Sequence, residues 1–125
     1  MKVLISGSTG FIGQALLPSL RVAGHEVCRL ARKNLVEGEM HIFWNPEEGR
    51  IGPGDLEGFD AVFHLAGEPI AQGRWTAVKN KRILDSRVQG TGLLARTLAG
   101  LREKPKVLIS ASAVGFYGDR GDEIL

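Results

Sequence analysis

The chain has 125 residues, a length that suits one globular domain and is too short for two. Hydrophobic residues make up 43% of it and charged residues 24%, which excludes a disordered or fibrous protein and predicts a folded core. The 16 lysines and arginines nearly balance the 14 aspartates and glutamates, so the formal net charge is +2 and we expect no nucleic-acid partner.

The first elements that the sequence predicts are a strand, a helix and a second strand. Residues 3–5 form a short apolar run before a glycine-rich turn, as is typical of a central parallel strand buried on both faces. Apolar residues recur at helical spacing over residues 11–23, and Gly24 ends this segment as a C-cap glycine would. Residues 27–31 predict the second strand.

The chain carries no sign of export or of membrane insertion. Its single cysteine, Cys28, cannot form an internal disulfide, which favours a reducing compartment. No apolar run approaches the roughly 20 residues of a membrane span. We therefore expect a cytoplasmic protein without a membrane anchor.

Three further strands follow. Residues 40–44 predict the third strand and residues 61–65 the fourth, each followed by a turn or glycine signal. The intervening residues 46–59 are rich in glycine and show no periodicity, so we expect irregular structure there. Residues 106–110 predict the fifth strand.

A long helix is expected between the fourth and fifth strands. Its apolar positions follow one stripe over about residues 75–101, and Pro105 ends it. Gly90 and Gly92 lie inside this stretch, where each costs about 1 kcal/mol relative to alanine. They indicate a kink or a close approach of the backbone to a neighbour.

Strands that alternate with helical segments predict an α/β domain on a parallel sheet, which we expect to span residues 1–125 as one domain. Right-handed crossovers would place the five strands, numbered in chain order, in the spatial order 3-2-1-4-5. This is one doubly wound mononucleotide-binding half with part of the second.

A glycine motif, Gly-Ser-Thr-Gly-Phe-Ile-Gly, lies between the first strand and the first helix. The first glycine permits a tight turn, the second lets the backbone approach a pyrophosphate, and the third lets helix and strand pack closely. Free amides and the helix dipole favour an anion there, and a P-loop is excluded because no Gly-Lys-Ser/Thr follows. The motif predicts a Rossmann-like dinucleotide-binding sheet. We expect the cofactor-binding residues of this loop to be Gly7, Thr9, Gly10, Phe11, Ile12 and Gly13.

The end of the second strand bears on which dinucleotide is bound. NAD-binding proteins usually place a carboxylate here for the ribose 2′-hydroxyl, whereas this chain has Ala31-Arg32-Lys33. Arg32 offers a planar donor fork to a 2′-phosphate, so Ala31 and Arg32 favour NADP(H) over NAD(H). The alternative is that both cations are merely solvated at a strand end.

Several motifs together resemble one known family. Residues 6–13, with the spacing Gly-x-x-Gly-x-x-Gly, resemble the extended short-chain dehydrogenase/reductases. Four further segments resemble its atypical subfamily of NAD-dependent epimerase/dehydratase, sugar-nucleotide epimerase-like proteins; they are 64–71 (HLAGEPIA), 74–76 (RWT), 86–88 (SRV) and 110–118 (SASAVGFYG). The resemblance extends along the whole chain.

The resemblance implies further cofactor contacts. Leu65 and Ala66, followed by Gly67, would line the adenine and ribose side, which agrees with the rule that open α/β sheets bind ligands beyond the carboxyl ends of their strands. Arg87 stands where the extended family commonly has asparagine and looks like the Ser-Arg pair of the subfamily. It would face the cleft and contact cofactor phosphate or ribose; the alternative is an exposed helical arginine.

The resemblance also implies a catalytic hydroxyl. Ser112 follows the fifth strand, where the family keeps a serine or threonine that hydrogen-bonds the substrate oxygen. Its distance to Tyr117 is five positions rather than the usual four, which leaves Ser110 as a weaker candidate. A structural hydroxyl that caps a strand end is the alternative for either serine.

The family's acid/base pair is absent from the sequence. In the family a lysine four positions after a tyrosine lowers the tyrosine pKa. Here the single tyrosine is Tyr117, and Gly121 occupies the lysine position. The three histidines lie far apart without ligand spacing, so we expect no metal site.

Three hypotheses of function follow. The preferred one is the NADP(H)-binding domain of an epimerase/dehydratase-like oxidoreductase that acts on a hydroxyl or carbonyl carbon of a sugar nucleotide or related small molecule. It would be truncated before the tyrosine-lysine segment and the substrate-binding part, and inactive alone. The alternatives are a non-catalytic dinucleotide-binding or regulatory module and an interaction fragment with an empty pocket. Truncation would expose a sheet edge, so we expect a homo-oligomer.

Overall fold

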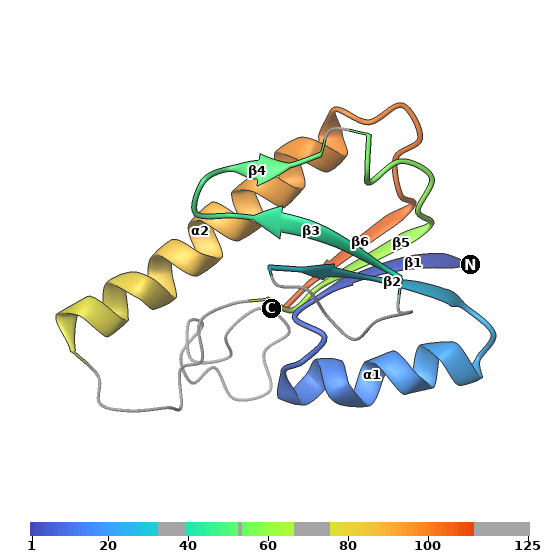
Figure 1. Ribbon diagram of the computed structural model, residues 1–125, viewed down its shortest axis with the longest axis horizontal. Coiled ribbons are helices and arrows are strands. Elements are labelled where there is room, and N and C mark those ends of the chain that lie inside the picture. Colours follow the sequence, from blue (N-terminus) through green and yellow to red (C-terminus); the bar gives the residue numbers. More distant parts are fainter. Residues whose placement is uncertain (33–39, 53, 67–75, 112–125) are drawn as a thin grey trace, which may run out of the picture.

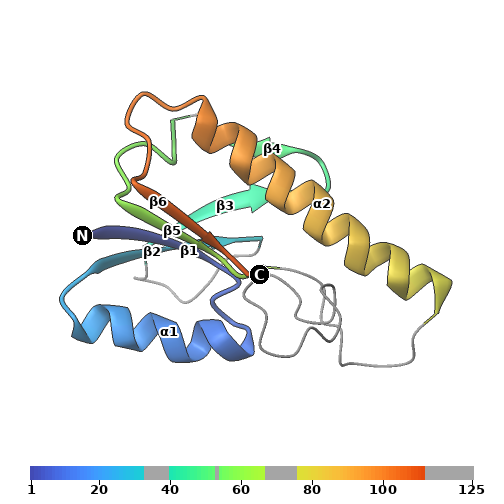
Figure 2. The same cartoon turned by 180° about the vertical axis from the view of Figure 1, so that it is seen from behind.

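The computed structural model describes residues 1–32, 40–52, 54–66 and 76–111. Their strands form one twisted sheet, with one helix on each side of it (Figures 1 and 2). The strands are β1 (Lys2–Ser6), β2 (Glu26–Ala31), β3 (His41–Asn45), β4 (Arg50–Ile51), β5 (Ala61–His64) and β6 (Val107–Ser110). Their order is β4-β3-β2-β1-β5-β6, which confirms the α/β class and the two-sided winding.

The predicted order 3-2-1-4-5 is confirmed for the five parallel strands, which are β3, β2, β1, β5 and β6. The prediction of irregular structure over residues 46–59 is wrong at β4. This strand returns antiparallel beside β3, where Trp44 is opposite Ile51 and Asn45 is opposite Arg50. Two residues are too short to produce an alternating pattern, so the sequence shows only the turn before them.

The two helices are α1 (Phe11–Val22) and α2 (Ala77–Ala99). The hydroxyl of Thr76 caps α2 by accepting a hydrogen bond from the backbone N–H of Lys79 at 3.1 Å. The interior glycines do not interrupt α2. At Gly90 an added Cβ would lie 3.5 Å from the Trp44 ring, which is the predicted close approach to a neighbour.

Two apolar clusters hold the helices against the sheet. The larger one lies under α2 and includes Leu4, Trp44 and Leu94, each no more than 2% exposed. The smaller one joins Ile5 of β1 to Leu17 of α1. Burial on both faces explains why residues 3–5 at the centre of β1 form an uninterrupted apolar run.

The edges of the sheet differ from its centre. In β6, Val107, Leu108 and Ile109 are 40–46% exposed, and β6 is the last strand in the order. Self-association through this edge stays a prediction. Within the described residues, no helix is long and apolar enough to cross a membrane.

Candidate functional site

The glycine loop and the end of β5 come together at the carboxyl edge of the sheet. Gly7 has φ +73°, and a Cβ built on it would lie 2.5 Å from the carbonyl carbon of Leu65 and 2.6 Å from the amide nitrogen of Ala66. The next residue, Ser8, is buried and accepts a hydrogen bond from Nε of Arg29 in β2 at 2.7 Å. The structure thus joins two segments that the sequence assigned to one site.

We expect Gly7→Ala to lower the free energy of unfolding by about 2 kcal/mol, because a positive φ and a backbone clash both oppose the new methyl group. Chemical denaturation measures the change. Gly24→Ala is a control for φ alone, since Gly24 has φ +90° but no atom within 4 Å of the added Cβ. Equal losses in the two variants would contradict a close approach at Gly7.

The start of α1 is open toward solvent. Gly10 is the N-cap and provides no side-chain cap, and α1 has no acidic residue in its first turn. Its first amides therefore have no acceptor within the helix. Thr9 and Ile12 are also exposed, and Phe11 is 95% exposed. This combination suits an anion with an apolar neighbour.

The three loop glycines have different surroundings. A Cβ on Gly13 would clash with the carbonyl oxygen of Gly7, so Gly13 is required where α1 packs against the loop. A Cβ on Gly10 would have only that carbonyl oxygen within 4 Å, at 3.4 Å. Among the described residues, the space beside Gly10 is therefore free of other atoms, as close approach of a pyrophosphate requires.

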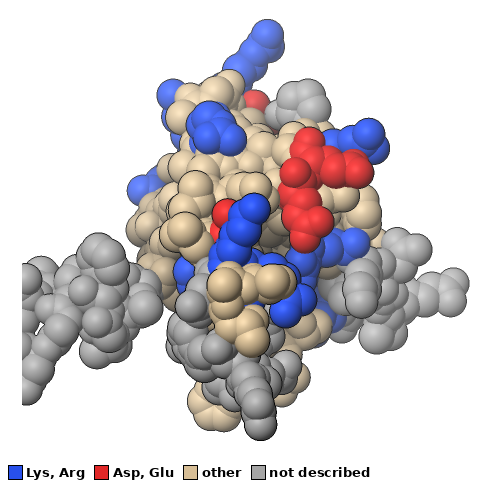
Figure 3. Space-filling model, turned by 90° about the vertical axis from the view of Figure 1, so that its left-hand side faces the viewer, with Lys and Arg blue, Asp and Glu red and all other residues tan. Residues whose placement is uncertain are grey.

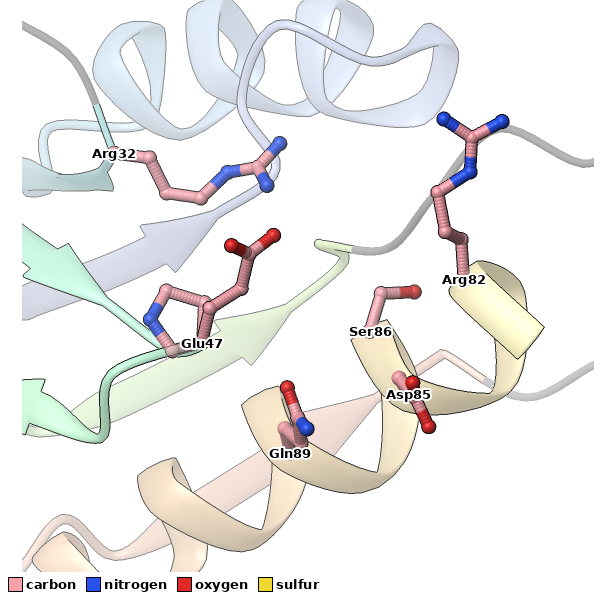
Figure 4. A pocket seen from close by; sticks show the side chains of 7 residues that line it. Arg32, Glu47, Arg82, Asp85, Ser86 and Gln89 are labelled. Atoms are coloured by element: carbon pink, nitrogen blue, oxygen red, sulfur yellow. The ribbon is translucent and has the colours of Figure 1, made fainter. Parts of the chain in front are cut away.

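A pocket of about 300 Å³ lies between the sheet and α2 (Figure 4). Arg32 and Glu47 extend into it from the sheet side, and α2 forms the facing wall. The α2 residues that line it are Arg82, Asp85, Ser86 and Gln89. The sequence predicts Arg32 at the site but does not predict this wall, although the spacing of its four residues places them on one helix face.

The charges do not form one basic surface. On the face shown in Figure 3, the coloured lysine and arginine side chains are interspersed with acidic and uncharged residues. The pocket itself combines two arginines with the carboxylates of Glu47 and Asp85. With as many acidic as basic side chains, the pocket is not part of a basic surface for an extended polyanion.

Arg87, a predicted cofactor contact, does not line this pocket. Arg87 is exposed, and its Nη1 donates to the carbonyl oxygen of Ile83 at 3.3 Å and to Oγ of Ser86 at 3.5 Å. Its contact with a cofactor stays a prediction. Gly67 and Ser112 lie outside the described residues, and so does Tyr117.

A buried polar bridge, formed by Ser6, His64 and Thr91, links β1 through β5 to α2. Ser6 Oγ lies 2.7 Å from Nδ1 of His64, and Nε2 of His64 lies 2.9 Å from Oγ1 of Thr91. The imidazole is 3% exposed and packs edge-on against the Trp44 ring at 6.2 Å between centroids. Burial lowers the pKa of His64 from its ordinary 6.5. The sequence spacing of Thr91 and His64, 27 positions apart, does not predict that the two side chains meet.

We expect the lowered pKa of His64 to make folding weaker in mild acid. In the unfolded chain His64 takes up a proton near pH 6.5, whereas in the folded chain it does so only at lower pH. The contribution of neutral His64 to the free energy of unfolding is therefore fully present above pH 6.5, and it is lost as the pH falls from there through the pKa of the folded state. Denaturation curves between about pH 7.5 and pH 5.5 measure the loss. His64→Gln should remove this contribution and His41→Gln should leave it. An unchanged pH dependence in His64→Gln would contradict the assignment.

Residues 3–124 match the NAD dependent epimerase/dehydratase family. The chain is 41% identical over 123 residues to epimerase family protein Mb2239 of Mycobacterium bovis, an alignment that covers 98% of this chain and 40% of that protein. The chain thus spans about 40% of the length of this and other curated mycobacterial relatives that it matches.

Solved structures have the same fold. The human epimerase family protein SDR39U1 (isoform 2), crystallised with NADPH, is 38% identical at a TM-score of 0.79; the match covers 94% of this chain and 38% of that one. MoeE5 in complex with UDP-glucose and NAD is 28% identical at a TM-score of 0.75, covering 100% of this chain and 40% of that one. With the glycine loop at the carboxyl edge of a two-sided parallel sheet, these matches show that the chain belongs to the NAD-dependent epimerase/dehydratase family.

Proposed function

We propose that this chain binds NADP(H) and forms the dinucleotide-binding part of an epimerase/dehydratase-type oxidoreductase. The observation that carries the proposal is the open flank of Gly10 at the start of α1, three residues after the Gly7 turn that packs against the Leu65–Ala66 peptide. Any side chain at position 10 would extend into this space, where the first amides of α1 and the positive end of the helix dipole would face a bound anion.

The preference for NADP(H) rests on the pocket at the end of β2. Arg32 and Arg82 line one cavity of about 300 Å³, at the lower end of the roughly 300–1,000 Å³ of small-molecule sites. Two guanidinium groups there suit a 2′-phosphate, whereas NAD(H) has only a hydroxyl at that position. The more similar of the two solved relatives contains NADPH, and the less similar one contains NAD.

The bound nicotinamide would accept or supply a hydride at a hydroxyl or carbonyl carbon. The contribution of this chain is to hold the pyrophosphate at the glycine loop and the adenosine end between β2 and α2. Ser112 is the residue that we assign to the substrate oxygen, on the resemblance alone. A sugar nucleotide is the substrate class proposed, in line with the UDP-glucose bound by MoeE5.

Isothermal calorimetry of the chain with NADPH and NADH tests the cofactor assignment. We expect measurable binding of both and tighter binding of NADPH. Equal affinity would contradict the role of Arg32 and Arg82, and the absence of binding to either would contradict the proposed function.

We expect no measurable epimerase, dehydratase or reductase turnover by the 125-residue chain. Ser112 can orient an oxygen atom but has no tyrosine-lysine pair to exchange its proton, and acid–base catalysis contributes about 10²–10⁴-fold. An assay with labelled NADP(H) and a panel of sugar nucleotides measures hydride exchange. Steady turnover that is lost on Ser112→Ala would overturn this expectation.

The alternative function, a regulatory module, predicts dinucleotide binding without hydride exchange even when the chain is part of a longer protein.

A further inference from the structure

The buried polar bridge contacts the proposed cofactor site through two successive peptide groups at the end of β5. Oγ of Ser6 accepts hydrogen bonds from the backbone N–H groups of Leu65, at 3.2 Å, and Ala66, at 3.3 Å. The N–H of Leu65 also bonds the carbonyl oxygen of Ser6 at 3.1 Å. Gly7 packs against the same Leu65–Ala66 peptide. The position of this peptide thus depends on Ser6 and limits the turn that opens the glycine loop.

The hydrogen bonds of the bridge have a preferred direction. Ser6 Oγ receives two backbone N–H groups, so its lone pairs are used and its own hydrogen points to Nδ1 of His64. Nδ1 is then the acceptor, and the proton of the neutral imidazole lies on Nε2, which donates to Thr91 Oγ1. In the other tautomer the Ser6 hydroxyl hydrogen would have no acceptor among these contacts, although Ser6 is fully buried.

The far end of the bridge lies on the helix that forms the pocket wall. Thr91 belongs to α2, which also carries Arg82 and Ser86 at the pocket. His64 is held between this helix and β1, with Trp44 against its ring. The bridge therefore connects the pocket wall to the loop side of the site through directional bonds.

We propose that Ser6, His64 and Thr91 are positioning residues for the dinucleotide. They fix the Leu65–Ala66 peptide, and with it the Gly7 turn, in the geometry that binds the cofactor, and His64 does so as the Nε2–H tautomer. This inference rests on the proposed function, because it assigns positioning residues to the same cofactor site. None of the three side chains needs to contact the ligand.

A purely structural bridge would stabilise the fold without affecting ligand affinity, so the test separates the two quantities. Thr91→Val keeps the shape of the side chain and removes the acceptor for Nε2–H. Thr97→Val is the matched control, since Thr97 is a half-buried threonine of the same helix whose hydroxyl donates to the carbonyl oxygen of Leu93 at 2.8 Å. The free energy of unfolding and the Kd for NADPH are measured for both variants.

We expect Thr91→Val to weaken NADPH binding by about tenfold and Thr97→Val to leave it within about twofold of the parent. Ser6→Ala, which removes the acceptor for Ala66 N–H, should weaken binding at least as much. Parent affinity in Thr91→Val and Ser6→Ala, whatever their stability, would overturn the inference. If the parent chain itself does not bind NADPH, the proposed function fails as well. If the parent binds and the two variants bind equally well, only this inference fails.

A measurement on the unmodified chain keeps the inference testable if the variants do not fold. Nitrogen-15 NMR of the imidazole should report the Nε2–H tautomer for His64, and addition of NADPH should shift both of its ring nitrogen resonances. An Nδ1–H tautomer, or ring resonances that do not respond to saturating NADPH, would overturn the inference.

Discussion

Gly10→Val should abolish dinucleotide binding while the chain keeps its fold. Within the part of the chain that the structure describes, the added Cβ meets only the carbonyl oxygen of Gly7, 3.4 Å away, so this part of the fold can accept it. Its branched carbons would occupy the space through which a pyrophosphate reaches the amides of α1. Loss of two charge-assisted hydrogen bonds, at about 2 kcal/mol each, corresponds to roughly 1000-fold weaker binding.

Calorimetry with NADPH measures this loss, and circular dichroism checks the fold. Gly54→Val is the matched control, because Gly54 is exposed and no atom of the described residues lies within 4 Å of an added Cβ. It should bind NADPH like the parent. A folded Gly10→Val chain of unchanged affinity would remove the glycine loop from the site.

Arg32→Asp should invert the cofactor preference. The substitution removes a bidentate donor from the pocket and places a carboxylate near the 2′-phosphate, which we expect to weaken NADPH binding by about 100-fold. NADH binding should be equal to or tighter than that of the parent, because a carboxylate can accept from the ribose 2′-hydroxyl.

Arg50→Asp provides the control for the change in overall charge. Arg50 is exposed on β4, where its Nε pairs with Glu48 at 3.1 Å, and it does not line the pocket. A surface pair of this kind contributes little to stability. If Arg50→Asp weakens NADPH binding as much as Arg32→Asp does, the effect is one of net charge and Arg32 is not the specificity residue.

The sequence predicts the parts of the site that depend on local chain geometry. The loop glycines could be recognised because a tight turn and a helix start impose their spacing within a few residues, and Arg32 because it directly follows a buried strand. The α2 wall could not be predicted, because the position of Arg82 and Ser86 opposite Arg32 depends on how α2 packs across the sheet. That packing is a tertiary contact, and local sequence spacing does not determine it. Thr91 was missed for the same reason: its partner, His64, lies 27 positions away on a different element.

The contact between Trp44 and His64 has an optical consequence. Trp44 is buried at 2% exposure with its ring edge-on to the imidazole, and the chain has one other tryptophan, Trp75. A protonated imidazole quenches indole emission by accepting an electron from the excited ring, whereas a neutral one does so far less. In a Trp75→Phe background the fluorescence intensity of Trp44 should therefore decrease when His64 becomes protonated. Trp44 can thus serve as an intrinsic fluorescent probe of the charge of His64.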